Sequence, residues 1–440
     1  MIQEPRVKFE LHHWPVRQIV DTFTSDRLNL QPVFQRASVW REQQRRHLLD
    51  SLLQNYPIPS IFLYRRLDTD SGRVVFEVMD GKQRIESILM FMGHIRGKFD
   101  VSVQRTLESA PEMMDYKCLC KLKLQSTLEE YQIQVVEVSG ELSDIIELFV
   151  RINSTGNALS RQEVRNAKFY QSEFLKTAKT IALRNEEYLQ GIGVIGAQQV
   201  RRMKHIELMS ELLYAAHLGG VANKKHVLDA AMRVDGLKGI ALKKATQSTV
   251  SGLNRLRKMF PKVSRSTRFH KVSDFYSLAV LVQTLDREGA VLTDLRRNTL
   301  AWDILEALST GVDQLADASR KLDFKKLTIQ EEVFLHYLQT VREGSDAESH
   351  RKKRHSILHG LLAPIFEYKD PQRLFSPEQR RILWNTAEKR VCEVCKRDLT
   401  WSDFHADHIK PFSQGGRTTL DNAARLCAEH NQQKGNKTRA

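Results

Sequence analysis

The sequence predicts a multidomain α+β protein with a mixed α/β N-terminal part, a mainly helical middle and a small C-terminal metal-binding module. Strand-like and helix-like patterns alternate up to about residue 170, apolar residues recur at helical spacing up to 375, and paired metal-ligand motifs follow. At 440 residues the chain is long enough for two or three domains. We therefore expect domains at 1–170, 171–375 and 376–440.

Composition restricts the class of protein. Hydrophobic residues make up 41% of the chain, enough for ordinary cores, and the formal net charge is +15. No apolar run approaches the roughly 20 residues that a membrane span needs, and the N-terminal stretch has no signal-peptide hydrophobic region. We expect a cytoplasmic protein that does not bind membranes and whose basic surface meets polyanions.

In the N-terminal part, a leucine stripe predicts a helix over residues 42–54, and two short apolar runs predict strands over 61–65 and 74–79. The segment Asp80-Gly81-Lys82-Gln83-Arg84 follows, and a helix is predicted from there through Met92. A glycine at such a turn lets backbone N–H groups approach an anion, and an arginine there can pair with phosphate. Taken alone, these residues are more typical of an ordinary structural turn.

The segment YKCLCKLKL places Cys118 and Cys120 at alternating positions. This alternation predicts a strand with both cysteines on one face, as small buried core residues and not as a redox pair.

The middle of the chain is predicted to be helical over residues 206–217, 275–285, 302–315 and 333–341, and it contains no repeat of solenoid length. Residues 236–273 hold ten basic residues and no acidic one. Such a stretch is typical of a surface that follows a phosphate backbone, although a solvated face is the simpler alternative. Arg255, Arg257 and Lys258 are our DNA-binding candidates here. Residues 350–355 (HRKKRH) are interpreted as a linker, a DNA-contacting turn or a solvated charged segment.

The C-terminal module begins with a helix predicted over 377–390 and continues with two ligand pairs. Cys392-x-x-Cys395 is followed after 31 residues by Cys427-x-x-His430, which can close a tetrahedral zinc site of three thiolates and one imidazole. Between the pairs lie Asp407-His408, Gly415-Gly416 and Asn422. The pairs alone are typical of a zinc ribbon that only binds, but a ribbon does not require this inner set. The tail after Gly435 is expected to fray.

Residues 392–435 resemble the H-N-H endonucleases, whose site is a β-hairpin plus a helix around one catalytic metal, the ββα-metal fold. The resemblance implies that His408 deprotonates the attacking water, that Asn422 holds the ring of this base, and that Asp407 and Asn431 bind Mg²⁺ or Mn²⁺. Lys434 is assigned to DNA contact. The sequence departs from the family at Asn431, where histidine is usual, and at His430, where a fourth zinc cysteine is usual. An alternative alignment makes His430 the catalytic ligand and leaves the zinc site open.

Three N-terminal motifs carry a second resemblance: Gln35-Arg36 with a tryptophan four residues on, Asp80-Gly-x-Gln-Arg84, and Phe149-x-x-x-Asn153. They resemble the N-terminal domain of GmrSD-type modification-dependent restriction enzymes, which also occurs in phosphorothioate-sensing SspE proteins. The resemblance spans about residues 10 to 170 and implies a ParB/sulfiredoxin-like fold that binds, and often hydrolyses, a nucleoside triphosphate. The residues that would line the nucleotide site are Gln35, Arg36, Asp80, Gly81, Gln83, Arg84 and Asn153. Lys82 departs from the family, which more often has glutamine there, and leaves nucleotide choice and hydrolysis open.

Together these features predict a metal-dependent DNA endonuclease of a restriction or phage-defence system, gated by a nucleotide- or modification-sensing N-terminal domain. The alternative is a nucleotide-gated DNA-binding regulatory protein with a purely structural zinc module, and RNA is a third candidate substrate. Paired strand breaks would require two modules, as in a homodimer, because each chain carries one.

Overall fold

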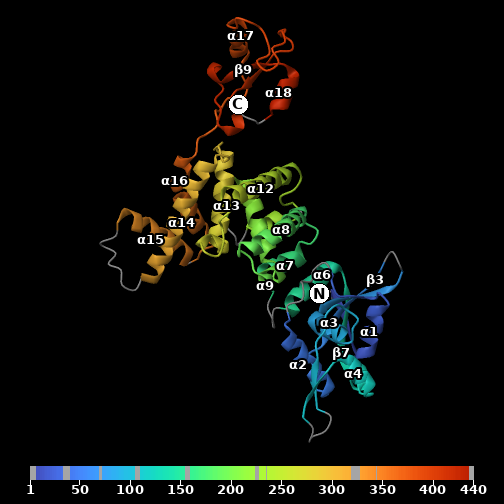
Figure 1. The fold of residues 1–440 in the computed structure, drawn as a ribbon. Coiled ribbons are helices and arrows are strands. Elements are labelled where there is room, and N and C mark those ends of the chain that lie inside the picture. Colours follow the sequence, from blue (N-terminus) through green and yellow to red (C-terminus); the bar gives the residue numbers. More distant parts are fainter. Residues whose placement is uncertain are drawn as a thin grey trace, which may run out of the picture. The chain divides into compact units, whose positions relative to one another are not determined.

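The computed structural model describes residues 6–32, 40–68, 72–104, 110–153, 159–222, 227–233, 235–318, 328–342 and 344–435. The chain forms two compact units. One comprises Met1–Lys179, Ile195–Glu207 and Met232–Val234, and the other comprises Thr180–Val194, Leu208–Ala231 and Asp235–Ala440. Figure 1 shows the helices and strands in the colours of the sequence.

The first unit is built on a five-stranded mixed sheet with the strand order β1-β7-β3-β4-β2. The pairs β1·β7 and β3·β4 are antiparallel, whereas β7·β3 and β4·β2 are parallel. The strands are β1 (Val7–Pro15), β2 (Leu28–Asn29), β3 (Ile61–Leu67), β4 (Val74–Asp80) and β7 (Gln132–Gly140). A separate two-stranded sheet consists of β5 (Val101–Val103) and β6 (Glu112–Met114). Both predicted strands are confirmed, and each extends slightly beyond its predicted end.

Helices of the first unit pack their apolar side chains into the same core as the side chains of this sheet. Leu49 and Leu52 of the predicted leucine stripe are fully buried, next to Val78 of β4 in the same core cluster. The helices are α1 (Val16–Thr24), α2 (Glu42–Leu53), α3 (Lys82–Phe91), α4 (Tyr116–Lys121), α5 (Gln125–Glu129), α6 (Leu142–Ile152), α7 (Arg161–Lys168) and α9 (Ala197–Arg201). The predicted helices at 42–54 and through Met92 correspond to α2 and α3.

The prediction for Cys118 and Cys120 is wrong. Residues 116–121 form helix α4, and both cysteines are exposed. Asp115 is the reason: its carboxylate accepts a hydrogen bond from the Cys118 backbone N–H at 2.8 Å and caps the helix. In a helix, residues two apart do not share a face as they do in a strand.

The middle of the chain is helical, as expected. Its helices are α8 (Glu173–Gly191), α10 (Lys204–Leu218), α11 (Val227–Met232), α12 (Gly239–Met259), α13 (Val272–Arg287), α14 (Leu295–Ala318), α15 (Ile329–Arg342) and α16 (Glu348–Leu362), with short 3₁₀ turns at Arg268–His270 and Ala363–Ile365. Helix α13 is buried along most of its length and packs against α12 and α16. It forms the central element of this helical region.

Residues 350–355 are neither a linker nor a turn, because they lie inside helix α16. Arg351 and Arg354 are almost completely buried, whereas Lys352 and Lys353 are exposed. Arg351 pairs with Glu211 and lies over the ring of Tyr276, and Arg354 donates hydrogen bonds to Ser277 Oγ and to the Thr340 and Ser345 carbonyls. Half of the basic cluster therefore holds helices together.

The C-terminal module contains α17 (Pro377–Asn385), β8 (His405–His408), β9 (Ala423–Leu426) and α18 (Ala428–Lys434), with 3₁₀ turns at Phe412–Gln414 and Leu420–Asn422. Helix α17 is shorter than the predicted 377–390. The module has its own small core, made of Phe375, Leu383, Cys392, Leu399, Phe404, Ala423, Ala424, Leu426 and Cys427. Two of the four predicted zinc ligands, Cys392 and Cys427, are thus part of the core.

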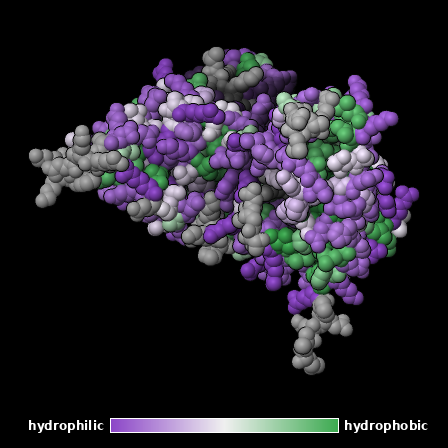
Figure 2. Space-filling model, turned by 90° about the horizontal axis from the view of Figure 1, so that it is seen from below, coloured by the Kyte–Doolittle hydropathy of each residue, from purple (hydrophilic) through white to green (hydrophobic). Residues whose placement is uncertain are grey.

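The surface agrees with a mean hydropathy of −0.42. On the face drawn in Figure 2, hydrophilic side chains predominate and apolar ones occur in small groups. Within the described ranges, no helix combines the length and apolar character needed to cross a membrane.

Candidate active site and metal centre

The candidate active site is a β-hairpin followed by a helix. Strands β8 and β9 pair antiparallel, with Asp407 opposite Ala424 and His408 opposite Ala423. Cys427 then caps helix α18, which carries His430, Asn431 and Lys434. The fold therefore brings together the two halves of the sequence motif, which are separated by more than a dozen residues.

The loop between the two strands is braced by Asn422. Its side-chain amide donates to the carbonyls of Lys410 and Arg417 at 3.2 and 2.8 Å, and its oxygen accepts from the Lys410 N–H at 2.8 Å. The prediction that Asn422 holds the ring of His408 is therefore corrected: Asn422 orders the backbone of the loop.

The two glycines of the loop are each required for a different steric reason. Gly415 has a φ of +83°, a conformation that side chains with a Cβ rarely adopt. A Cβ at Gly416 would lie 1.8 Å from the Lys410 carbonyl oxygen and 2.9 Å from Nδ2 of Asn422. The Gly-Gly pair is needed so that the loop can fold back tightly over Asn422.

His408 lies at the end of β8 and is held by Thr418 and aromatic rings. Its Nε2 is 3.0 Å from Thr418 Oγ, and its ring centroid is 4.7 Å from that of Phe375 and 5.7 Å from that of Phe412. Thr418 donates its own hydroxyl proton to the Gln372 carbonyl, so His408 Nε2 must be the donor to Thr418. The neutral ring then carries its lone pair on Nδ1, which is the nitrogen available as a base.

The charge state of His408 is set by its surroundings. Burial lowers the pKa of His408 below its usual value, the Asp407 carboxylate opposes that shift, and the Lys434 ammonium adds to it. The ring is only 7% exposed. At neutral pH the imidazole is therefore uncharged, as a general base must be.

Asp407 is paired with Lys434 of α18. The Lys434 ammonium donates hydrogen bonds to the Asp407 carboxylate and to the His408 carbonyl. Lys434 is predicted to contact DNA, but its side chain is 9% exposed and turned into the site, so the structure gives it a different place. Asn431 lies one helical turn before Lys434, on the same face of α18. The Asp407 carboxylate thus already has a positive charge beside it. A carboxylate and an amide oxygen, as Asp407 and Asn431 offer, are the donors that Mg²⁺ or Mn²⁺ prefers.

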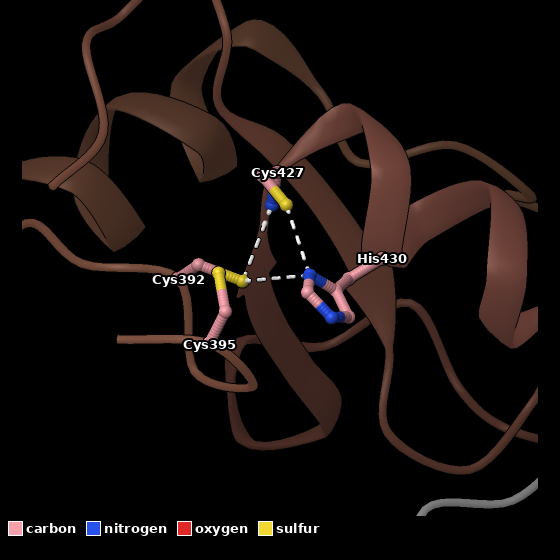
Figure 3. A group of neighbouring side chains, drawn as sticks. All are labelled: Cys392, Cys395, Cys427 and His430. Atoms are coloured by element: carbon pink, nitrogen blue, oxygen red, sulfur yellow. Dashed lines mark hydrogen bonds between the residues drawn. The ribbon is translucent and has the colours of Figure 1, made fainter. Parts of the chain in front are cut away.

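The four predicted zinc ligands lie together (Figure 3). One ligand atom from each of Cys392, Cys395, Cys427 and His430 can be chosen so that all lie within 4.8 Å of one another, and Cys427 Sγ is 3.1 Å from His430 Nδ1. This arrangement favours the alignment in which His430 replaces the fourth cysteine. Three sulfurs and one imidazole fit a closed zinc site.

Backbone amides prepare one thiol for metal binding. Burial of Cys392 opposes its ionisation, but hydrogen bonds from the backbone N–H groups of Cys395, Cys427 and Val394 outweigh burial and lower the pKa of Cys392 to about 6. A thiol with this pKa is already largely ionised at neutral pH, which is the form that binds zinc.

The predicted nucleotide site lies where β4 meets α3. Gly81 occupies the N-cap of α3 with a φ of +95°, and a Cβ there would lie 2.7 Å from Ile61 Cγ1. Arg84 pairs with Asp80 at 2.7 Å and donates to the Ser60 carbonyl, while Gln83 Oε1 accepts from the Trp40 N–H at 2.9 Å. Four of the predicted residues therefore share one turn.

Other predicted nucleotide residues are not joined to this turn by a described contact. Asn153 ends helix α6, and its side chain donates to the Phe149 carbonyl within the same helix. Gln35 and Arg36 lie outside the residues that the structure describes. The complete nucleotide site stays a prediction.

The predicted DNA-binding residues of α12 have partners within the helical region. Arg255 pairs with Asp286 at 3.1 Å, and Arg257 lies over the ring of Tyr188 and donates to Asn185 Oδ1 at 2.6 Å. Lys258 is exposed. Their role in DNA binding stays a prediction, and Lys258 is the most available of the three.

Thr418 is the residue of the site that sequence reasoning misses. It stands in an ordinary loop segment, Arg417-Thr418-Thr419, without a spacing that links it to His408. It is nevertheless 4% exposed and makes its contacts with His408, Gln372 and Asp370. Only the folded loop brings its hydroxyl to the imidazole.

Comparison with known proteins identifies both ends of the chain. Residues 17–170 match the family described as GmrSD restriction endonuclease, N-terminal domain, and residues 392–437 match the family described as HNH endonuclease. No curated protein matches the chain. The two matches have the GmrSD-type architecture, and the chain is a DNA-cleaving hydrolase, a restriction-type nuclease.

Proposed function

We propose that the protein is a divalent-metal-dependent DNA endonuclease of a restriction or phage-defence system, and that its N-terminal domain gates cleavage in response to a nucleotide or a DNA modification. Cytoplasmic location and the requirement for two chains in a double-strand break belong to the same proposal. The observation that carries it is that one hairpin holds both His408, positioned by Thr418, and the adjacent Asp407 carboxylate.

The residues of the hairpin have separate tasks in this proposal. His408 Nδ1 takes the proton of the attacking water, and Thr418 keeps the ring in the tautomer that makes Nδ1 basic. Asp407 and Asn431 hold Mg²⁺ or Mn²⁺, which supplies positive charge for the phosphate and leaving oxygens. Lys434 supports the Asp407 carboxylate and keeps a positive charge close to the site.

The zinc centre has a structural task. It ties the segment around Cys392 to the start of α18, and Cys392 and Cys427 both belong to the module's small core. This placement supports zinc as the element that sets α18, and with it Asn431 and Lys434, against β8.

The β4–α3 turn supports the gating part of the proposal. Arg84 is held by Asp80 and Ser60 so that its guanidinium lies at the start of a helix, where backbone N–H groups favour anions. A triphosphate can exchange with the Asp80 carboxylate as the partner of Arg84, because both offer oxygens to the same guanidinium.

The test is plasmid nicking with Mg²⁺ or Mn²⁺ by wild type, His408→Ala and His405→Ala. His408→Ala should abolish nicking and keep DNA binding and zinc content, because only proton transfer and water positioning are lost. His405 is a histidine of the same strand outside the motif, so His405→Ala should cleave normally. Nicking by His408→Ala at the wild-type rate would rule out this base. A wild type that binds zinc and DNA but never cleaves would favour the regulatory alternative.

A further inference from the structure

The helical region contains a cavity that the nuclease site does not use. It has a volume of about 600 Å³ and lies among α10, α12 and α13, with a wall that includes His217, Lys244, Ser248, Ser251, Gln283 and Arg287. This volume is within the range of about 300 to 1,000 Å³ that is typical of small-molecule sites. Helices α12 and α13, which supply most of this wall, pack against each other (Figure 1).

The central observation is the side chain of Gln283. It is 5% exposed, it lines the cavity, and neither its Nε2 nor its Oε1 hydrogen-bonds to any atom of the described chain. A buried amide without partners destabilises a fold, so such a group calls for an explanation. An amide offers one donor and one acceptor side by side, and it is complementary to a planar group that offers the reverse pair.

A glycine in helix α12 makes room for the Gln283 side chain. A Cβ at Gly252 would lie 2.7 Å from Gln283 Cγ, so the glycine allows α12 to pass close to the glutamine stem. Gly252 lies in the middle of a 21-residue helix, where glycine costs stability relative to alanine. Two residues that each lower stability thus meet at the cavity.

The charges at the mouth have one sign. Lys244 and Arg287 are exposed cations, and the one acidic residue of the wall, Asp286, is paired with Arg255 at 3.1 Å. His217 adds an exposed aromatic ring, 5.9 Å from the ring of Tyr214. The cavity therefore offers a buried amide inside, and an imidazole ring and two positive charges among its exposed lining residues.

This order matches one nucleotide unit with its base inside and its phosphate outside. We propose that the cavity binds a single nucleobase turned out of a DNA strand, with Gln283 pairing with the edge of the base and with Lys244 and Arg287 meeting the flanking phosphates. Base edges carry adjacent donors and acceptors, and glutamine pairs with adenine in two places. Proteins that read or modify single bases take them out of the stack in this way. The basic segment 236–273 contains α12, whose exposed Lys243, Lys244 and Lys258 are the cations that the strand would follow.

The first experiment measures binding of the four deoxynucleoside monophosphates by calorimetry to wild type, Gln283→Met and Gln314→Met. Methionine keeps the shape of glutamine and removes the amide. Gln283→Met should weaken binding of at least one monophosphate on the order of ten-fold or more and should leave the unfolding temperature equal or higher, since an unsatisfied amide is removed. Gln314 is an exposed amide on α14, so Gln314→Met should change neither property. Lys244→Gln should weaken the monophosphates more than the nucleosides.

The same proteins are then tested with a duplex that carries 2-aminopurine, whose fluorescence rises when it leaves the stack. Wild type should raise the signal, and Gln283→Met should not. Arg46→Ala removes an exposed cation of α2 that does not line the cavity, so it should behave as wild type in both assays. The proposal is overturned if no monophosphate binds, if Gln283→Met binds as wild type or unfolds at a clearly lower temperature, or if the fluorescence does not change.

Discussion

At the scale of single residues, Thr418 decides which nitrogen of His408 carries the proton. Thr418→Val keeps the side-chain shape but removes the acceptor for Nε2–H, so the ring can change tautomer or rotate. We expect DNA cleavage to fall on the order of ten- to a hundred-fold, the size typical of losing a group that orients a catalytic-site histidine. Nicking rates under identical metal conditions provide the measurement.

Thr418→Ser is the matched control, because serine keeps the hydroxyl and should retain most of the activity. The unfolding temperature of both variants should be compared, since Thr418 also reaches Gln372. Full activity in Thr418→Val would mean that the aromatic rings alone position His408.

The sequence predicts those site residues whose chemistry depends on spacing. Cys392, Cys395, Cys427 and His430 come together because two ligand pairs can close one tetrahedral site. The contacts of Asn422 and Lys434 are harder to predict from the sequence. An amide or an ammonium group can hydrogen-bond to several kinds of partner, and the folded loop and helix determine which partner is within reach. Asn422 selects two loop carbonyls, and Lys434 selects Asp407.

At the scale of helices and strands, α16 shows how buried charge escapes sequence reasoning. Arg351, Arg354, Leu358 and Leu362 are its buried residues, at spacings of three and four. The apolar half of this stripe can be recognised in the sequence. Its first two positions are arginines, which sequence reasoning assigns to the solvent-exposed surface. By contrast, α2 was predictable because Leu48, Leu49 and Leu52 make up most of its buried stripe, although that stripe also includes Arg45.

Arg351→Met should destabilise the helical region. It removes the guanidinium that pairs with the buried Glu211 carboxylate, and removing one partner of a buried ion pair costs about 3 to 5 kcal/mol. The free energy of unfolding from urea titration measures this loss. Lys352→Met, on the exposed face of the same helix, should change it little. Adding Glu211→Leu to Arg351→Met should recover much of the loss, and no recovery would show that the pair is not the origin.

The zinc centre makes a separate prediction for the C-terminal module. Cys427→Ser should release zinc and unfold the module, because Cys427 is both a predicted zinc ligand and a core residue and so small a core cannot fold alone. Zinc content by atomic absorption and limited proteolysis report the two effects. Cys120→Ser replaces an exposed cysteine of α4 and should change neither. Full zinc occupancy in Cys427→Ser would remove this residue from the ligand set.

At the scale of the whole molecule, the proposed gate requires that the β4–α3 turn controls a nuclease on another part of the chain. Arg84→Ala should remove a charge-assisted contact of about 1.5 to 3 kcal/mol and lower triphosphate affinity about ten- to a hundred-fold. A ligand acts on cleavage only through its different affinity for two states, so the variant must lose the nucleotide response, whichever sign it has.

Plasmid nicking across a nucleotide titration measures this coupling. Arg46→Ala is the control, because Arg46 forms an exposed pair with Glu42 on α2 of the same unit and should keep the response. Arg84 also anchors Asp80 and Ser60, so the folded state of Arg84→Ala is checked by its unfolding temperature. Identical responses in wild type and Arg84→Ala would show that this arginine does not link nucleotide to cleavage.

Helix α18 has the predicted zinc ligands Cys427 and His430 at its start and Lys434 in its last turn, so one short helix connects the proposed zinc centre to the proposed catalytic site. A restriction nuclease is dangerous to the cell that makes it. If zinc is needed to hold this helix against β8, as proposed, each newly made chain should be inactive until it has bound zinc. Zinc supply would then control when the nuclease becomes active. A zinc-starved cell should tolerate high expression of this protein, whereas a zinc-replete cell should not.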